Sequence, residues 1–323
     1  MIVLVVPAVV AAVVIAFLRR SRWSSRLADH PNERSLHSAP TPRVGGIGVL
    51  AGALPVAAIV AGDSLGILIG CAAALGLVSL WDDLQGLPIQ VRLPAHVAAA
   101  AVAVLAMASP APAHFELGVV EAVLAVVALV WMTNLFNFMD GSDGLAGGMA
   151  AIGFATLAIA ACQAGAMPLA LVAAALASAS VGFLAHNFPP ARVFLGDAGS
   201  VPLGFLAGAL GFYGALASVW PLWFPLLVFS PFIADATLTL LRRIVRGERF
   251  WRAHRDHYYQ RLVIAGWSRR RLALCAYALM AAAAASALAA GAAGRSLRFG
   301  IILVWAALYA LLFIAIELRV RSV

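Results

Sequence analysis

The chain has 323 residues, of which 63% are hydrophobic and only 11% are charged. A soluble globular domain is usually about 45–50% apolar and about 25% charged, so this composition excludes an ordinary water-soluble fold and predicts an integral membrane protein. The formal net charge is +8, and every basic side chain is an arginine. Arginines at the cytoplasmic ends of membrane helices explain this charge better than nucleic-acid binding, so we expect no nucleic-acid partner.

Apolar segments long enough to cross a bilayer, about 20 residues each, recur along the whole chain. About 11 segments qualify, in chain order: residues 1–18, 45–61, 65–81, 94–111, 117–135, 145–164, 167–186, 199–217, 220–241, 271–291 and 297–317. We therefore expect an all-α, polytopic membrane helix bundle of about 11 transmembrane helices. We also expect residues 1–323 to form a single integral membrane domain, which includes a cytoplasmic loop at residues 242–270.

The arginines predict an orientation. Of the 22 basic residues, all but Arg295 and Arg298 fall on the same side of this alternating set of spans. Because cytoplasmic loops carry the excess of Lys and Arg, the N-terminus is expected outside and the C-terminus in the cytoplasm. The first segment is followed, not preceded, by arginines at positions 19, 20 and 22, which predicts a retained helix and not a cleaved signal peptide.

Carboxylates from separate loops gather on the arginine-rich side. They are Asp29, Glu33, Asp82, Asp83, Asp140, Asp143, Asp197, Asp235, Glu248 and Asp256. Charge at the membrane surface is costly and persists mostly where it pairs or functions. This pattern predicts a metal and phosphate site that faces the cytosol.

The end of the fifth span carries a polar motif with a regular spacing. Asn134, Asn137, Asp140 and Asp143 recur every third residue, so a helical turn would place them roughly on one face. Two amides and two carboxylates suit Mg²⁺, ribose hydroxyls or a nucleobase edge. An acidic, glycine-containing turn between two membrane helices is the alternative interpretation.

Three more aspartates lie at helix ends. Asp82 and Asp83 end the third span, and neighbouring side chains on a helix point about 100° apart. One would therefore face a metal or phosphate pocket while the other acts as a general base, unless both form a solvated acidic cap. Asp197 is flanked by glycines just before an apolar helix, where backbone N–H groups can bind phosphate, and a helix N-cap is its alternative.

Basic residues occur in two of the cytoplasmic segments. The loop at 242–270 has histidines and arginines beside aromatic residues, among them Arg252, His254, Arg255 and His257. Such a set would clamp a diphosphate and stack on a base, or else form a basic interfacial helix on anionic lipid. Arg43 follows a loop of prolines before the second span and is available for phosphate, with a membrane-entry turn as the alternative.

Taken together and in this order, the segments resemble the polyprenyl-phosphate N-acetylhexosamine-1-phosphate transferase family. The matching runs are residues 29–46, Asp82-Asp83, residues 134–145 and residues 194–200. The resemblance implies an enzyme that uses Mg²⁺, with Mn²⁺ as an alternative, to transfer a sugar 1-phosphate from a UDP-N-acetylhexosamine to undecaprenyl phosphate with release of UMP. It implies a bacterial inner-membrane enzyme with its active site facing the cytoplasm, and a homodimer as a plausible assembly.

The resemblance also assigns roles. It implies catalytic roles for Asp82, Asp83, Asp140, Asp143, His254 and His257. It implies substrate binding by Asn187 and metal binding by Asp197, Asn134 and Asn137, and from the basic segments we also expect substrate binding by Arg43, Arg252 and Arg255. Arg43 or another arginine would replace a lysine that is usual in the family's first cytoplasmic loop.

The histidine loop separates the branches of this family. The phospho-N-acetylmuramoyl-pentapeptide transferase branch resembles a run of three histidines, whereas this chain has His254-Arg-Asp-His257. The loop is more similar to that of the subgroup that initiates O-antigen in lipopolysaccharide synthesis. A pentapeptide-transferase-like enzyme remains one alternative, and a secondary transporter with intramembrane acids is a second, from a different class.

Overall fold

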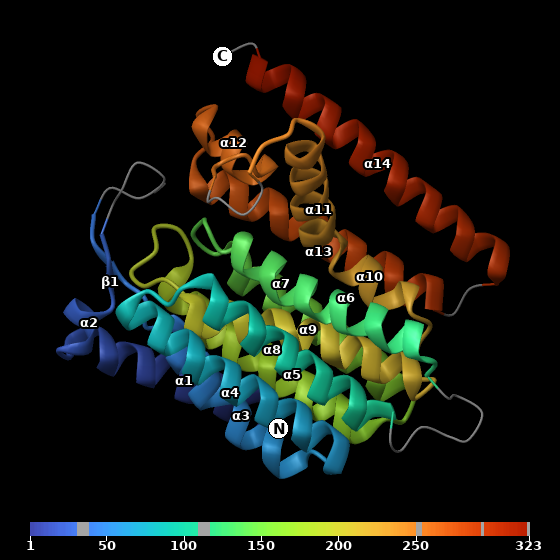
Figure 1. Ribbon diagram of the computed structural model, residues 1–323, viewed down its shortest axis with the longest axis horizontal. Helices are drawn as coiled ribbons and strands as arrows, with labels where there is room; N and C mark the ends of the chain where they lie inside the picture. Colours follow the sequence, from blue (N-terminus) through green and yellow to red (C-terminus); the bar gives the residue numbers. More distant parts are fainter. Residues whose placement is uncertain (31–38, 109–116, 250–253, 292–293, 322–323) are drawn as a thin grey trace.

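The protein is described by a computed structural model over residues 1–30, 39–108, 117–249, 254–291 and 294–321, and it is almost entirely helical (Figure 1). The first elements are α1 (Ile2–Arg20), α2 (Trp23–Arg26), β1 (Ala28–Asp29), β2 (Thr41–Pro42), α3 (Gly45–Val60), α4 (Asp63–Gln85) and α5 (Ile89–Ala108). They are followed by α6 (Val119–Phe138), α7 (Leu145–Gln163), α8 (Met167–Asn187), α9 (Asp197–Leu216), α10 (Trp223–Val228), α11 (Ser230–Val245), α12 (Tyr258–Ile264), α13 (Arg269–Gly291) and α14 (Arg295–Arg321). The strands form one short antiparallel pair, with Ala28 opposite Pro42.

Within the described ranges, nine helices are long and apolar enough to cross a bilayer: α1, α4, α5, α6, α7, α8, α9, α13 and α14. The predicted polytopic, all-α membrane fold is confirmed. The predicted span at 45–61 corresponds to α3, which is apolar but has only 16 residues. The last residues of the predicted span at 94–111 lie outside the described residues, and the predicted orientation stays a prediction.

One predicted span is wrong in its form. Residues 220–241 do not make one helix, because α10 ends at Val228 and α11 begins at Ser230. Pro231 stands in the first turn of α11, where a missing N–H costs nothing but where the ring blocks a continuous helix. The loop predicted at 242–270 is also partly helical, since α11 continues to Val245 and α12 lies within it.

The bundle has a protein-packed centre and a lipid-facing edge. In the most apolar stretch of each helix, 78% of the residues of α9 are buried inside the protein, but only 17% of those of α1 and of α14. Figure 1 shows α14 along one edge of the molecule, beyond α13. Exposed apolar side chains on the outer helices suit hydrocarbon, and the buried α9 is the element on which the polar site is built.

Candidate functional site

The loop before α9 is held by backbone hydrogen bonds to the start of α3. Phe194 donates its N–H to the Pro42 carbonyl at 2.9 Å. Gly45 and Gly46 donate theirs to the carbonyls of Phe194 and Leu195 at 2.9 and 2.7 Å. These bonds satisfy N–H groups that the first turn of a helix leaves free, and they tie the two segments together.

Two glycines let the starts of α3 and α9 touch. A Cβ added at Gly46 would lie 2.3 Å from the Gly199 nitrogen, and one at Gly199 would lie 2.6 Å from the Gly46 Cα. No larger side chain fits between two backbones at this distance. The contact therefore fixes where α9 begins and where Asp197, its first residue, is placed.

Asp83 at the end of α4 caps the N-terminus of α9. Its side chain is 1% exposed and accepts hydrogen bonds from the N–H groups of Ala198 at 2.9 Å and Asp197 at 3.3 Å. Gly196 precedes them at φ 74°, and a Cβ there would lie 2.8 Å from Asp83 Oδ2. A carboxylate is favoured at a helix N-terminus by the free N–H groups and the helix dipole. The cap that sequence reasoning considered for Asp197 is thus supplied by another helix.

The neighbouring Asp82 has different partners from Asp83. Its carboxylate accepts from the Leu87 N–H at 2.6 Å and from Arg92 Nη1 at 2.9 Å. Arg92 also lies 3.7 Å from Asp197 Oδ2. The adjacent aspartates therefore point in different directions, as helix geometry predicts, and both lie beside Asp197.

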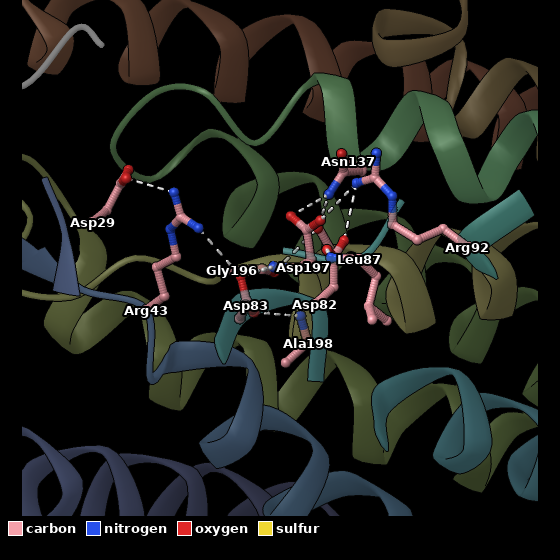
Figure 2. Close-up of polar contacts among 11 residues, drawn as sticks. Asp29, Arg43, Asp82, Asp83, Leu87, Arg92, Asn137, Gly196, Asp197 and Ala198 are labelled. Carbon is pink, nitrogen blue, oxygen red and sulfur yellow. Dashed lines mark hydrogen bonds and ion pairs between the residues drawn. The ribbon is translucent and has the colours of Figure 1, made fainter. Parts of the chain in front are cut away.

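Arg43 pairs with the opposite side of the carboxylates. Its Nη2 lies 2.5 Å from Asp29 and its Nη1 3.5 Å from Asp83. Burial lowers the pKa of the guanidinium, but the carboxylates of Asp29, Asp83 and Asp197 outweigh that cost and the pKa is raised. Figure 2 shows Arg43 and Arg92 approaching the aspartates from opposite sides.

Asp140 completes the group of aspartates. It lies in the turn between α6 and α7 and accepts a hydrogen bond from the Gly196 N–H. Burial, followed by repulsion from Asp197 and Asp83, raises the pKa of its carboxyl well above the usual value, although Arg43 and the Gly196 N–H act in the opposite direction. The carboxyl groups of Asp82, Asp83 and Asp140 thus each interact with that of Asp197, and two arginines face the four. We call these four residues the aspartate cluster.

The predicted stacking of the 134–143 motif on one helical face is wrong. Helix α6 ends at Phe138, so only Asn134 and Asn137 are on the helix. Asn137 donates to Asp197 Oδ1 at 2.8 Å and so supports the aspartate cluster. Asn134 donates instead to the Val130 carbonyl of its own helix at 2.7 Å. The turn that follows separates the two aspartates from the helical repeat.

Asp143 and Asn187 lie where the α6–α7 turn meets the loop before α9. Asp143 is 4% exposed and accepts from the Ala191 N–H at 3.0 Å, with an arginine of α13 at 3.4 Å. Asn187 accepts from the Gly144 N–H at 2.8 Å and donates to the Val193 carbonyl at 2.9 Å. Both side chains join the α6–α7 turn to the loop before α9.

The histidine loop packs against the end of α6. The His257 ring stacks on Phe138 with centroids 6.1 Å apart, and His254 lies 4.9 Å from His257. Burial, then repulsion from His257 and Arg243, lowers the pKa of His254 to about 4. Arg255 is exposed, and Arg252 lies outside the described residues.

Comparison with known proteins identifies the family. Residues 65–215 match the profile of glycosyl transferase family 4. A Mycolicibacterium smegmatis decaprenyl-phosphate N-acetylglucosaminephosphotransferase is 32% identical over 77% of this chain and 71% of its own length. The chain belongs to glycosyl transferase family 4. A Yersinia pestis undecaprenyl-phosphate alpha-N-acetylglucosaminyl 1-phosphate transferase is 30% identical over 84% of this chain and 78% of its own length.

A second branch of glycosyl transferase family 4 is similar to a lesser degree. A Shouchella clausii phospho-N-acetylmuramoyl-pentapeptide-transferase is 28% identical over 80% of this chain and 86% of its own length. The family that the motifs indicated is therefore confirmed.

Three residues of this family member were given no site role by sequence reasoning. Arg92 was counted only for orientation, yet it contacts Asp82 and Asp197. Asp235 was only noted among the acids, yet it is buried and accepts from the start of α12. Tyr259 donates its hydroxyl hydrogen to the Phe138 carbonyl at 3.0 Å, where α6 ends and the α6–α7 turn begins. A lone acid inside the apolar α11 was the one signal in the sequence that pointed to such a contact.

The donor atoms of the aspartate cluster fit a hard divalent cation. Carboxylate and amide oxygens are the ligands that Mg²⁺ prefers, and a bound cation would offset the burial and repulsion that raise the pKa of Asp140. Among the described residues, no group of three or more His, Cys, Asp or Glu side chains is arranged so that it could hold a metal ion. Mg²⁺ is usually held by one or two carboxylates together with substrate phosphates, so a complete protein cage is not required.

Proposed function

We propose that this protein transfers N-acetylhexosamine 1-phosphate from a UDP-sugar to a polyprenyl phosphate, giving polyprenyl-diphosphate-sugar and UMP. The aspartate cluster carries this proposal. It brings together residues that are distant in the chain at one end of the bundle, and two arginines that can bind phosphate lie beside it. The names of the relatives support the same reaction.

Both substrates are anionic, so the site must overcome repulsion between them. We propose that Asp197 would hold Mg²⁺ together with the phosphates of the substrates. When bound, Mg²⁺ would neutralise phosphate charge and polarise the phosphoryl oxygens. Asn137 orients Asp197 through its 2.8 Å hydrogen bond, whatever occupies the site.

The residues of the chain then have distinct tasks. An oxygen of the lipid phosphate attacks the β-phosphorus of the UDP-sugar, the bond from that phosphorus to the bridging oxygen breaks, and UMP leaves. Asp82 orients the acceptor or takes its proton, and Arg92 links Asp82 to Asp197. Arg43 and the histidine loop, including Arg255, stabilise the charge of the leaving group.

An apolar groove gives the lipid tail a place to lie. A cavity of about 430 Å³ lies among α6, α9, α10 and α11, with Leu129, Met132, Gly208, Phe212 and Phe229 in its wall. Met132 precedes Asn137 by five residues of α6, a rise of about 8 Å. We propose that prenyl units fill this groove while the phosphate reaches the aspartate cluster.

The test is UMP release by the purified protein with undecaprenyl phosphate, Mg²⁺ and UDP-N-acetylglucosamine, the sugar named in the relatives. Asp197→Asn is expected to lower kcat/KM by about 100-fold or more. Asp63→Asn is the matched control, because Asp63 is exposed at the opposite end of α4 from the aspartate cluster. Equal turnover by the two variants would contradict the assignment.

The alternatives make different predictions in the same assay. A pentapeptide-transferase-like enzyme would turn over a UDP-N-acetylmuramoyl-pentapeptide and not a UDP-N-acetylhexosamine. A transporter would release no UMP and would have its acids near the bilayer midplane. Asp82, Asp83 and Asp197 instead lie at helix ends, which favours the transferase. We propose further that the product starts O-antigen or a related surface polysaccharide, and that the cluster faces the cytoplasm of a bacterial inner membrane.

A further inference from the structure

Four arginines line a cavity of about 250 Å³ between α11, α12 and α14, outside the aspartate cluster. They are Arg242, Arg243, Arg246 and Arg261, and the acids in the same wall are Asp256 and Glu317. We call this cavity the arginine pocket. Even when Glu248 beside Arg243 is included, the acids are fewer than the arginines, so the pocket keeps an excess of positive charge. One water molecule takes up about 30 Å³, so the space is enough for a phosphate group.

The acids of the arginine pocket leave part of its charge without a partner. Glu317 is shared by two guanidiniums, those of Arg242 and Arg261, and one carboxylate cannot neutralise both. Burial, followed by repulsion from Arg242, lowers the pKa of Arg261, and Arg246 adds to the repulsion. An anion among these three arginines would relieve that repulsion.

Arg246 is the arginine most available to a ligand. Its side chain is 59% exposed, and its Nη1 lies 3.9 Å from Glu248 Oε1, which is too far for a hydrogen bond. The guanidinium carries five N–H donors in a planar fork that matches the oxygens of a phosphate. Arg246 can therefore turn these donors to a phosphate without breaking a hydrogen bond to Glu248.

Helix α12 presents different faces to the arginine pocket and to the aspartate cluster. The Tyr258 ring lies beneath two pocket arginines, with its centroid 5.5 Å from Arg242 Cζ and 5.4 Å from Arg261 Cζ. The next residue, Tyr259, instead donates to the Phe138 carbonyl at the start of the α6–α7 turn. Neighbouring side chains on a helix point about 100° apart. The arginine pocket is therefore a separate site.

The arginine pocket opens beside apolar surface that faces lipid. Helix α14 is among the least buried spans, and Figure 1 shows α12 near its C-terminal end. Glu317 lies close to that end, and Leu318 after it is exposed. On α11 the exposed apolar side chains of Leu241, Ile244 and Val245 alternate with the pocket arginines. A charged pocket beside exposed apolar side chains fits an amphiphile better than a free phosphate ion.

We propose that the arginine pocket binds the phosphate of an anionic phospholipid, whose acyl chains lie on the exposed apolar side chains of α11 and α14. Basic pockets between membrane helices are typical sites for such headgroups. Arg242, Arg246 and Arg261 donate to the phosphate oxygens, and Glu317 keeps the first and last of these in place. The inference goes beyond the transferase reaction and does not depend on it, because none of these residues has a task in that reaction.

The first measurement compares two lipids on the wild type. Thermal unfolding of the purified full-length protein in a non-ionic detergent is followed while dioleoyl phosphatidylglycerol or dioleoyl phosphatidylcholine is added. The two lipids have the same acyl chains, but only the first has a net negative charge. We expect the first to raise the melting temperature until the effect saturates, and the second to raise it much less. Equal effects of the two lipids overturn the proposal, and this comparison needs no variant.

The second measurement locates the effect in the arginine pocket. Arg246→Gln is expected to raise the half-saturating concentration of phosphatidylglycerol by about 10-fold, the equivalent of one lost charge-assisted hydrogen bond. Arg270→Gln is the matched control, because Arg270 is exposed at the start of α13 and lies outside the pocket. It should leave the half-saturating concentration unchanged. Equal values in the two variants overturn the proposal, since the attraction is then a general property of the surface charge.

Two further additions to this assay decide the role of Glu317 and the source of the phosphate. Glu317→Gln removes the anion that competes with the lipid, so it should lower the half-saturating concentration, in the opposite direction from Arg246→Gln. An equal or higher value overturns the place of the phosphate between Arg242 and Arg261. If Glu317→Gln does not fold, the Arg246 comparison still decides. Sodium phosphate at constant ionic strength should not stabilise the wild type, and stabilisation equal to that by phosphatidylglycerol overturns the lipid as the occupant.

Discussion

The contact between α3 and α9 can be tested by adding one methyl group. In Gly46→Ala the new Cβ would lie 2.3 Å from the Gly199 nitrogen, whereas ordinary contacts begin at 3.4 Å. The neighbouring atoms are backbone, so no side chain can rotate away, and the two helix starts must separate by about 1 Å. Overpacking of this kind costs about 1–3 kcal/mol.

The separation should affect catalysis more than folding. Asp197 is the first residue of α9, and a displacement of about 1 Å at a reacting centre can lower a rate by about 100-fold. We therefore expect Gly46→Ala to unfold at a lower temperature and to lose most of its UMP release. Gly199→Ala should behave alike, because its Cβ would lie 2.6 Å from the Gly46 Cα.

The control is Gly70→Ala in α4, where an added Cβ has no atom within 4 Å. Alanine is favoured over glycine in a helix interior by about 1 kcal/mol, so this variant should be as stable as the wild type or more so, and fully active. Thermal unfolding in detergent and UMP release are measured on all variants side by side. A Gly46→Ala protein with wild-type melting and turnover would refute the close approach of the two helices.

Two further predictions concern charge. Arg92→Leu removes a cation from Asp82 and Asp197, so its melting temperature should fall more with EDTA than with millimolar Mg²⁺, and an equal fall in both would contradict this. The pKa of His254 is about 4 in the folded protein and has its ordinary value of 6.5 in the unfolded chain, so the unfolded chain binds this proton more readily. The wild type should therefore lose stability as the pH falls from 6.5 to 4, and His254→Gln should flatten that part of the curve of melting temperature against pH.

Much of this fold could be predicted because a helix that spans a bilayer must be apolar along its length, and this is visible in the sequence. Helices that must satisfy their own backbone in lipid leave long apolar runs, and these matched the helices within a few residues. The failures have local causes. Proline near Ser230 breaks an apolar run that hydropathy cannot distinguish from a single span, and a turn after Phe138 ends a repeat of three that resembles a helical face.

The aspartate cluster illustrates what a sequence can and cannot supply. Glycines and acids at helix ends pointed to Asp82, Asp83, Asp140 and Asp197, and the structure brings these four together. The hydrogen-bond partners that reach these residues from other helices leave no recognisable pattern in the nearby sequence. The cap on α9 comes from α4 and the cap on α12 from α11, and no spacing rule connects an acid to an N–H group in a distant segment.

The α9 cap has a consequence for how the protein is made. Asp83 and the Ala198 N–H that it accepts are separated by 115 positions in the chain. When α4 first enters the bilayer during synthesis, the helix start that its carboxylate caps does not yet exist. The aspartate cluster is therefore a late product of membrane insertion, and a nascent chain that stops before Asp197 lacks one of its four residues.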